Sequence, residues 1–219
     1  MDVIFGNLDL WGTAITNTLL VFAGGGLLAL VLGIIVGGMR VSPVPIARGV
    51  GTLYVNIVRN TPLTLVFFFF VFGYSALGFA NKVEPIVLGI LAIGIYTATY
   101  VAEVLRAGIN TVPVGQAEAA RAIGLPFGQV MSLVVLPQAF RSVVPPMMSV
   151  FIALLKNTTV AAGFSVAELA AMRATINDAA GRPGNPMEVL LWVALVFVVL
   201  VLLMSLVQNR LEKKWRIAR

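Results

Sequence analysis

The sequence predicts an all-α integral membrane protein with five transmembrane helices, the N-terminus outside and the C-terminus inside. Of its 219 residues, 59% are hydrophobic and only 11% are charged, and the mean hydropathy is +0.99. A soluble domain carries about 25% charged and about 45–50% apolar residues, so the excess apolar surface here must face lipid. Histidine and cysteine do not occur, which excludes disulfides, thiol or imidazole catalysis and the usual zinc and copper sites.

Five apolar stretches account for the predicted spans, since a helix needs about 20 mainly apolar residues to cross the hydrocarbon. The spans are expected at about residues 12–39, 60–80, 85–106, 142–165 and 188–208 of a single transmembrane domain, residues 1–219. The fourth span is interpreted as one helix that carries a charge, Lys156, inside it.

The basic residues set the predicted orientation, because cytoplasmic segments of membrane proteins are enriched in lysine and arginine. With the N-terminus outside, three basic residues fall on the outer side, Lys82, Arg173 and Arg182. The inner side receives ten, which are Arg40, Arg48, Arg106, Arg121, Arg141, Arg210, Lys213, Lys214, Arg216 and Arg219. The basic C-terminus is then a membrane anchor, and no nucleic-acid partner is expected.

Small residues indicate where the spans touch, because close backbone approach drives helix packing in lipid. They recur every four residues in the first span, at Gly25, Ala29, Gly33 and Gly37, and in the third, at Gly94, Ala98 and Ala102. The fifth span is almost entirely valine and leucine and is predicted to lie at the periphery. The phenylalanines at positions 67–70 and 72 are interpreted as lipid-facing side chains.

Two segments are amphipathic. From Pro43 to Arg59, apolar residues recur at helical spacing opposite polar ones, which predicts an interfacial helix that leads into the second span. On the outer side, residues 165–179 form either a short helix or a plain connecting loop.

The longest inner segment, about residues 110–141, predicts a helix, a sharp turn and a second helix. Residues 116–123 are strong helix formers, Gly124 suits a helix C-terminus, and Pro126 suits the start of the next helix. The second helix is expected to end near Leu136, because Pro137 disfavours α-helical geometry in the residue before it.

This segment resembles the EAA loop of bacterial ABC importer permeases. The matching residues are Glu118-Ala119-Ala120, Gly124, Val134 (isoleucine in the family) and Leu136-Pro137. The resemblance covers about residues 10–210. Within the family, the chain is similar to the polar amino acid branch (histidine-, glutamine-, glutamate- and arginine-type permeases). The residues that match this branch are 59–63, 100–103, 106–109, 115–116 and 155–158. It implies the type I importer permease fold and a multi-pass permease domain in the bacterial cytoplasmic (inner) membrane.

The resemblance also implies a role and partners. Glu118, Ala119, Ala120 and Gly124 are expected to dock into a separate ATPase and transmit its motion. The implied partners are two ATP-binding subunits, a second permease subunit (identical or paralogous), an extracytoplasmic solute-binding protein, membrane lipid and an amino acid. This chain is then not an enzyme and holds no cofactor itself, ATP and Mg²⁺ belonging to the partner. In agreement, its four lysines never follow a glycine, as the lysine of a P-loop does.

Lys156 is the main candidate for contact with the substrate. A cation about 13 residues into a span is costly unless it faces a partner or a water-filled path. Asn157 and Thr158 follow it directly. Either the ammonium binds the carboxylate of an amino acid, or it forms a structural pair, for instance with Glu103. Glu103 itself is most simply paired with Arg106, three positions later on the same helix.

Other polar residues are candidates for the same path. Arg59, Asn60 and Thr61 open the second span, and Thr97, Thr99 and Tyr100 place hydroxyls in the third. Threonine hydroxyls in membrane helices often bond to their own backbone, so a purely structural role stays open for each.

Asn157 stands where many relatives of this branch carry an acid, so the site has no obvious counter-ion for a basic side chain. A glutamate- or glutamine-type substrate is therefore favoured for an ATP-driven importer. The alternative is an ion-driven secondary transporter or channel for a small polar solute. A membrane enzyme is disfavoured, because the sequence contains no recognisable catalytic dyad, metal cluster or activated nucleophile.

Overall fold

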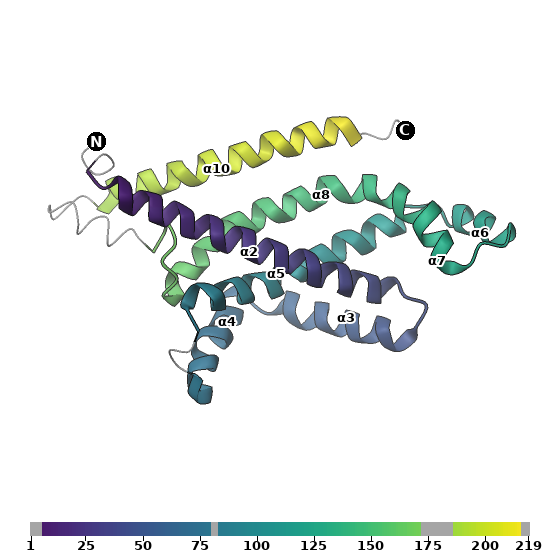
Figure 1. Cartoon of the computed structure of the whole chain (residues 1–219), viewed down its shortest axis with the longest axis horizontal. Helices are drawn as coiled ribbons and strands as arrows, with labels where there is room; N and C mark the ends of the chain where they lie inside the picture. Colours follow the sequence, from purple (N-terminus) through teal and green to yellow (C-terminus); the bar gives the residue numbers. More distant parts are fainter. Residues whose placement is uncertain (1–5, 80–82, 172–185, 216–219) are drawn as a thin grey trace.

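The computed structural model describes residues 6–79, 83–171 and 186–215, and every regular element among them is helical (Figure 1). The predicted all-α membrane fold is therefore confirmed. Four helical runs are long and apolar enough to cross a bilayer: 8–41 (α2, Leu8–Val41), 85–110 (α5, Pro85–Asn110), 127–164, and 187–213 within α10 (Pro186–Trp215). A fifth span results if a bent helix pair, residues 45–78, is counted as one.

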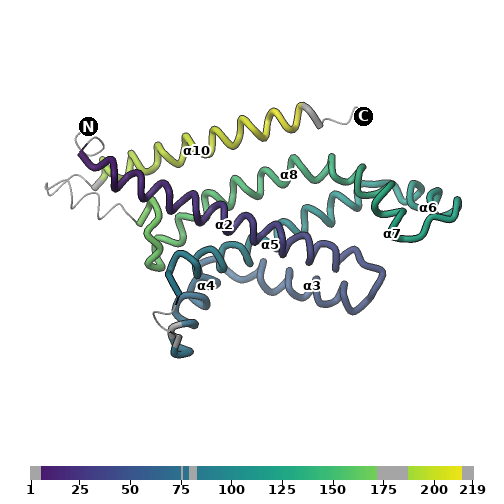
Figure 2. The backbone as a smooth tube through the Cα atoms, viewed as in Figure 1, coloured from purple at the N-terminus to yellow at the C-terminus, as the bar shows by residue number. Residues whose placement is uncertain are grey.

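The two ends of the chain lie toward opposite ends of the long helices (Figure 2). An odd number of spans requires this arrangement. Which of the two ends faces the cytoplasm stays a prediction from the arginine and lysine count.

Helices α2 and α5 form the centre of the bundle, and small residues let them approach. A Cβ atom added at Gly25 would lie 2.5 Å from Ile93 Cγ2, and one added at Gly33 would collide with the side chain of Val101. Gly94 of α5 faces Leu28 of α2 in the same way. The predicted small-residue faces are therefore packing surfaces.

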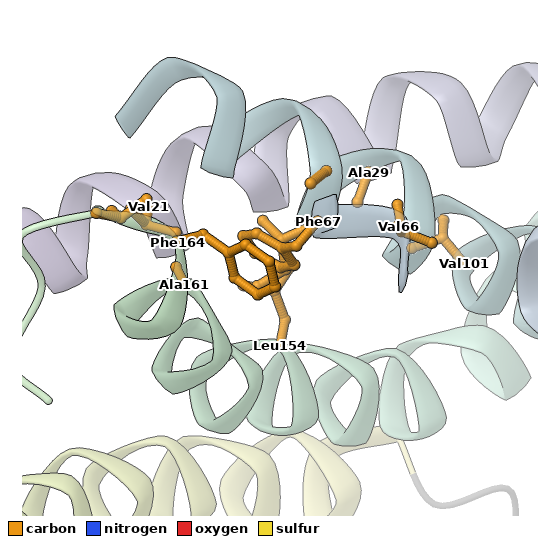
Figure 3. Packing of buried hydrophobic residues seen from close by; sticks show 11 residues of the cluster. Val21, Ala29, Val66, Phe67, Val101, Leu154, Ala161 and Phe164 are labelled. Atoms are coloured by element: carbon orange, nitrogen blue, oxygen red, sulfur yellow. The ribbon is translucent and has the colours of Figure 1, made fainter. Parts of the chain in front are cut away.

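The main hydrophobic core joins residues of α2 and α5 with residues of α4 (Leu63–Phe68), α8 (Leu136–Asn157) and η4 (Thr158–Phe164), and it contains two buried phenylalanines, Phe67 and Phe164 (Figure 3). Phe67 of α4 is fully buried and stacks on Phe164 with 5.2 Å between ring centroids. The interpretation of this phenylalanine run as lipid-facing is therefore wrong for Phe67, whereas Phe68, Phe69 and Phe72 are exposed. One helical turn places only one or two of these consecutive rings against the bundle.

The amphipathic helix α3 (Pro45–Asn60), expected as an interfacial helix that leads into the second span, runs beside α2 and α5 (Figure 1). Gly51 permits this approach, because an added Cβ would lie 2.9 Å from Arg40 Cγ. The Tyr54 hydroxyl donates to the Ile95 carbonyl of α5 at 2.7 Å. After Pro62 the chain bends by 101° into α4, η1 (Phe69–Gly73) and η2 (Ser75–Phe79).

The inner segment folds as α6 (Val114–Ala122), a turn, α7 (Phe127–Gln129), η3 (Val130–Val135) and α8 (Leu136–Asn157). The expected helix end near Leu136 is wrong, because the helix continues through Pro137. A proline lacks the amide N–H and clashes with the carbonyl four residues earlier. The wider π-helical turn of η3, directly before α8, accommodates both effects.

Beyond α8, a 3₁₀ segment, η4 (Thr158–Phe164), completes the run, and α10 lies at the periphery as predicted. The start of α10 packs on α2 through Val189, Val193 and Trp11. The choice between helix and loop for residues 165–179 concerns a segment that lies mostly outside the described residues.

Candidate functional site

A cavity of about 340 Å³ lies between α5 and α8. Thr97 and Tyr100 line it from α5, and Asn157 lines it from the last turn of α8. The other lining residues are Ser149, Val150, Ala153 and Leu154. The structure thus brings three of the eight predicted path residues to one cavity, and none of the lining residues is charged.

Hydroxyl groups on α5 are arranged along one edge of this cavity. The Tyr100 hydroxyl lies 2.9 Å from that of Tyr96, one turn earlier. Thr97 is buried and lines the cavity, whereas the buried Thr99 does not line it and donates to the Tyr96 carbonyl at 2.7 Å. The Thr99 hydroxyl is therefore already bonded to the backbone of its own helix. Tyr100 and Thr97 are the α5 residues whose hydroxyl groups line the cavity and are available to a ligand.

Arg59 lies beside the cavity through its contact with Tyr100. Its guanidinium carbon is 5.9 Å from the centroid of the Tyr100 ring, within cation–π range. Its Nη1 lies 3.4 Å from Glu103 Oε1, and about half of the side chain is exposed. The Tyr100 ring and the Glu103 carboxylate thus orient the Arg59 guanidinium, which is still accessible to an anion.

Glu103 is the centre of a larger ionic cluster than the sequence predicted. The expected pair with Arg106 is present, with 3.2 Å between Nη2 and Oε2. Arg40, from the end of α2, donates to Glu103 Oε1 at 2.7 Å. Sequence reasoning missed Arg40 because no local spacing connects residues 63 positions apart.

Lys156 is exposed and does not line the cavity. The structural alternative, a Lys156–Glu103 pair, is wrong, because the described partners of Glu103 are three arginines. Arginine is the usual choice for such partly buried pairs, since its planar guanidinium matches the carboxylate. In the part of the chain that is described, no carboxylate lies within 4 Å of the Lys156 ammonium.

Three further predicted path residues bond to their own helices. Asn60 donates to the Asn56 carbonyl at 2.7 Å, and Thr61 donates to the Ile57 carbonyl at 2.8 Å. Thr158 is buried and donates to the Leu155 carbonyl at 2.8 Å. These contacts correspond to the structural role left open by the sequence.

Ser149 was missed, although it lies on the same face of α8 as Ala153 and Asn157. Its position two turns before Asn157 was a usable signal, because residues at i and i+4 share a helix face. Its hydroxyl accepts a hydrogen bond from Gln208 of α10 at 3.0 Å.

The predicted coupling residues lie on α6 and its C-terminal turn, at the end of the molecule farthest from the start of α2 (Figure 1). Ala120 packs against Val130 and Val135 of η3, which fixes one face of α6. Glu118 and Ala119 are exposed on the other faces. The helix is thus fixed on one face by η3, and its exposed residues include small ones together with one acidic and one basic side chain, Glu118 and Arg121.

Gly124 ends α6 in a left-handed turn with φ of +87°. Its N–H donates to the Arg121 carbonyl at 2.9 Å, and the Leu125 N–H donates to the Ala120 carbonyl at 3.2 Å. This pair of bonds is the Schellman motif, which favours glycine because other residues are strained at positive φ.

Comparisons with known proteins agree on one family. Residues 29–217 match the family described as "binding-protein-dependent transport system inner membrane component". The chain is 43% identical over 201 residues to the glutamate transport system permease protein GluC of Corynebacterium glutamicum, covering 85% of each chain. It is 33% identical over 216 residues to the probable glutamine ABC transporter permease protein GlnM of Bacillus subtilis, covering 98% of this chain and 97% of that one. A crystal structure of an amino acid ABC transporter with histidines superimposes with a TM-score of 0.86 at 25% identity, covering 96% of each chain.

Proposed function

The chain belongs to the family of binding-protein-dependent transport system inner membrane components, and from this premise we propose that it forms the path for glutamate or glutamine in an importer. It is a multi-pass inner-membrane permease subunit of an amino acid ABC transporter, a transport component that works with an ATPase and a substrate-binding protein. The alternative of an ion-driven secondary transporter or channel is not supported by these relatives.

The observation that carries the proposed substrate is the composition of the α5–α8 cavity. Thr97, Tyr100 and Asn157 offer hydroxyl and amide groups, and Arg59 lies against the Tyr100 ring with half of its side chain exposed. A guanidinium suits a carboxylate, and an asparagine amide suits the side chain of glutamate or glutamine. No lining residue is acidic, so a lysine or arginine side chain would lack a counter-charge there.

Lys156 plays a secondary part in this proposal. Its ammonium lies outside the cavity but only one residue from Asn157. A positive charge at that distance raises the local concentration of acidic substrates without contacting them. Asn60, Thr61 and Thr158 then support the surrounding helices, because their polar groups are already bonded to the backbone.

For coupling, we propose that Glu118, Ala119, Ala120 and Gly124 form the contact with the ATPase. Two observations support this proposal. One face of α6 is packed against η3 while the others are exposed, and α6 lies at the opposite end of the molecule from the N-terminus of α2. The assembly would hold two ATP-binding subunits with ATP and Mg²⁺, a second permease subunit, identical or paralogous, and an extracytoplasmic binding protein. One described chain offers only four or five spans, which is few to enclose a path.

The test is uptake by the full transporter, with its ATPase and binding protein, reconstituted in proteoliposomes. Glutamate or glutamine should be accumulated on addition of ATP, and arginine and lysine should not. Arg59→Gln and Asn157→Leu should each reduce uptake at least about tenfold, the loss expected when a charged or polar substrate group loses its partner. Ala153→Ser, on the same cavity wall, serves as the control. Preferred uptake of arginine or lysine would overturn the proposed substrate.

A further inference from the structure

A second cluster of basic side chains lies where α2, α3 and α5 meet. Arg40 is in the last turn of α2, Arg48 is near the start of α3, and Arg106 is near the end of α5. Glu103 is the one described carboxylate paired with Arg40 and Arg106. The cluster therefore keeps a surplus of positive charge, which favours an anion as its ligand.

Arg40 carries an unused hydrogen-bond donor. Its side chain is only 8% exposed, and one terminal nitrogen donates to Glu103. Its Nε is buried and has no hydrogen-bond partner in the described part of the chain. Buried polar groups are normally satisfied, so a buried guanidinium with a free donor indicates that an acceptor is missing.

Two cavities share these arginines. The larger, about 630 Å³, lies along α3 and is also lined by Thr52, Leu53 and Asn56. The smaller, about 310 Å³, lies against the inner segment and is also lined by Ser42, Asn110 and Met131. Arg40, Arg48 and Arg106 line both, and neither cavity has an acidic lining residue. The three guanidinium groups therefore separate two spaces that can both admit an anion.

The larger cavity adjoins an apolar surface of α3. Leu53 lines the cavity and is 60% exposed, and Ile46 and Val50 are also exposed on this helix. Such a surface does not suit a small soluble anion, which needs water around its remaining oxygens. It suits a ligand with a charged head and hydrocarbon chains.

The position along the helices points to the same ligand. Arg40 and Ser42 mark the end of the long apolar helix α2, the depth at which lipid phosphates lie. Basic pockets between membrane helices at this depth bind the head groups of anionic lipids. We propose that Arg40, Arg48 and Arg106 bind the phosphate of an anionic phospholipid, whose acyl chains lie on the apolar surface of α3 beside Leu53.

This site is separate from the proposed amino acid path. Arg48 lines neither the α5–α8 cavity nor the α6 surface, and its guanidinium donates to the Ser42 and Pro43 carbonyls at 3.1 and 3.3 Å. Loss of lipid binding and loss of the transport function can therefore be observed independently.

The experiment measures lipid bound to the purified transporter, the full chain with its co-purifying subunits, by native mass spectrometry in detergent. It compares phosphatidylglycerol with phosphatidylcholine of the same acyl chains, and a third series adds inorganic phosphate as competitor. Phosphatidylglycerol should bind preferentially, and Arg48→Gln should reduce its binding about fivefold, the effect of one basic residue near an anionic membrane surface. Arg141→Gln, an exposed arginine of α8 outside the cluster, should leave binding unchanged.

Two more variants separate the lipid site from a simple structural role of Arg48. Arg48→Lys keeps the charge and should restore most of the binding, and Leu53→Asn should weaken lipid binding while Arg48 is intact. Equal binding of both lipids, or equal loss in Arg48→Gln and Arg141→Gln, would overturn the proposal. Displacement of phosphatidylglycerol by millimolar inorganic phosphate would also overturn it, since the site would then recognise phosphate alone.

Discussion

Arg40 on α2 donates a hydrogen bond of 2.7 Å to Glu103 on α5, joining the two central helices 63 positions apart in the chain. The same carboxylate pairs with Arg59 of α3 and Arg106 of α5. One glutamate thus connects three helices. Of its arginine partners, Arg59 lies against the ring of Tyr100 in the α5–α8 cavity, whereas Arg40 and Arg106 line the proposed lipid site.

Replacing Glu103 by glutamine should destabilise the folded protein by about 3 kcal/mol. The change leaves the nearly buried Arg40 without its charge partner, and breaking a buried ion pair from one side is strongly unfavourable. Thermal unfolding in detergent measures the loss, with Glu84→Gln at an exposed helix start as the control. Equal unfolding temperatures for the two variants would contradict the structural role of Glu103.

Replacing Gly33 by leucine should destabilise the α2–α5 contact by at least about 1–3 kcal/mol, the cost of overpacking a close contact. The new side chain would collide with Val101. Gly38→Leu is the matched control, because nothing lies within 4 Å of a Cβ at that position of the same helix. The yield of folded protein after extraction and its unfolding temperature should fall only for Gly33→Leu.

Gly124→Val should disturb the end of α6 and reduce coupling between ATP hydrolysis and uptake. A β-branched residue at φ of +87° costs about 1–2 kcal/mol, which is enough to open the turn. Gly124→Asn should retain coupling, since asparagine tolerates this conformation, and Gly128→Val serves as a second control at an ordinary φ with open space around it. The ratio of substrate imported to ATP hydrolysed is the measurement.

Glu118→Lys should abolish substrate-stimulated ATP hydrolysis and leave membrane insertion intact. The side chain is exposed on α6, so its replacement changes the docking surface with little effect on the fold of the chain. Gln129→Lys introduces the same residue on α7, outside the α6 surface. Normal uptake by the Glu118 variant would argue against the proposed contact with the ATPase.

Stability should fall as pH rises from about 4.5 to about 7 because of Glu168, which follows η4 outside the membrane-spanning segments. Burial raises the pKa of its carboxyl group to about 7, although the Ala171 N–H donates to one of its oxygens. Between these values the folded protein holds a proton that the unfolded chain has lost, so deprotonation favours unfolding. Unfolding temperatures measured across this range should show the decline, and Glu168→Gln should remove it.

The sequence was sufficient to predict the helical membrane fold, because apolar length and small-residue spacing are properties of single helices. It also predicted the α6–turn geometry, since Gly124 and Pro126 act on adjacent residues. It predicted the local pair of Glu103 with Arg106, but it could not predict the partners Arg40 and Arg59, which come from two other helices and depend on how the helices cross. The wrong interpretation of Phe67 as lipid-facing has the same cause, because its burial depends on the position that η4 gives to Phe164.

The candidate site shows a similar division. The polar residues of the path were recognised by type, but only Thr97, Tyr100 and Asn157 meet at one cavity. Lys156 was chosen as a candidate because a charge inside an apolar stretch is costly. That argument predicts how deep the residue lies along the span, but not toward which side of the helix its side chain points. The error at Pro137 arose because local proline rules do not include a π-helical turn, which requires the surrounding packing to stabilise it.

The unbroken helical run from Phe127 to Phe164 has a mechanical consequence. Its central part, the 22-residue helix α8, extends for about 33 Å at the α-helical rise, and no loop separates η3 from Asn157. If the proposed coupling is correct, a displacement of the segment around α6 and η3 would reach one side of the α5–α8 cavity through α8 without passing through a loop. The opposite side, α5, is held against α2 by tightly fitted glycines, so the chamber would widen on a single side.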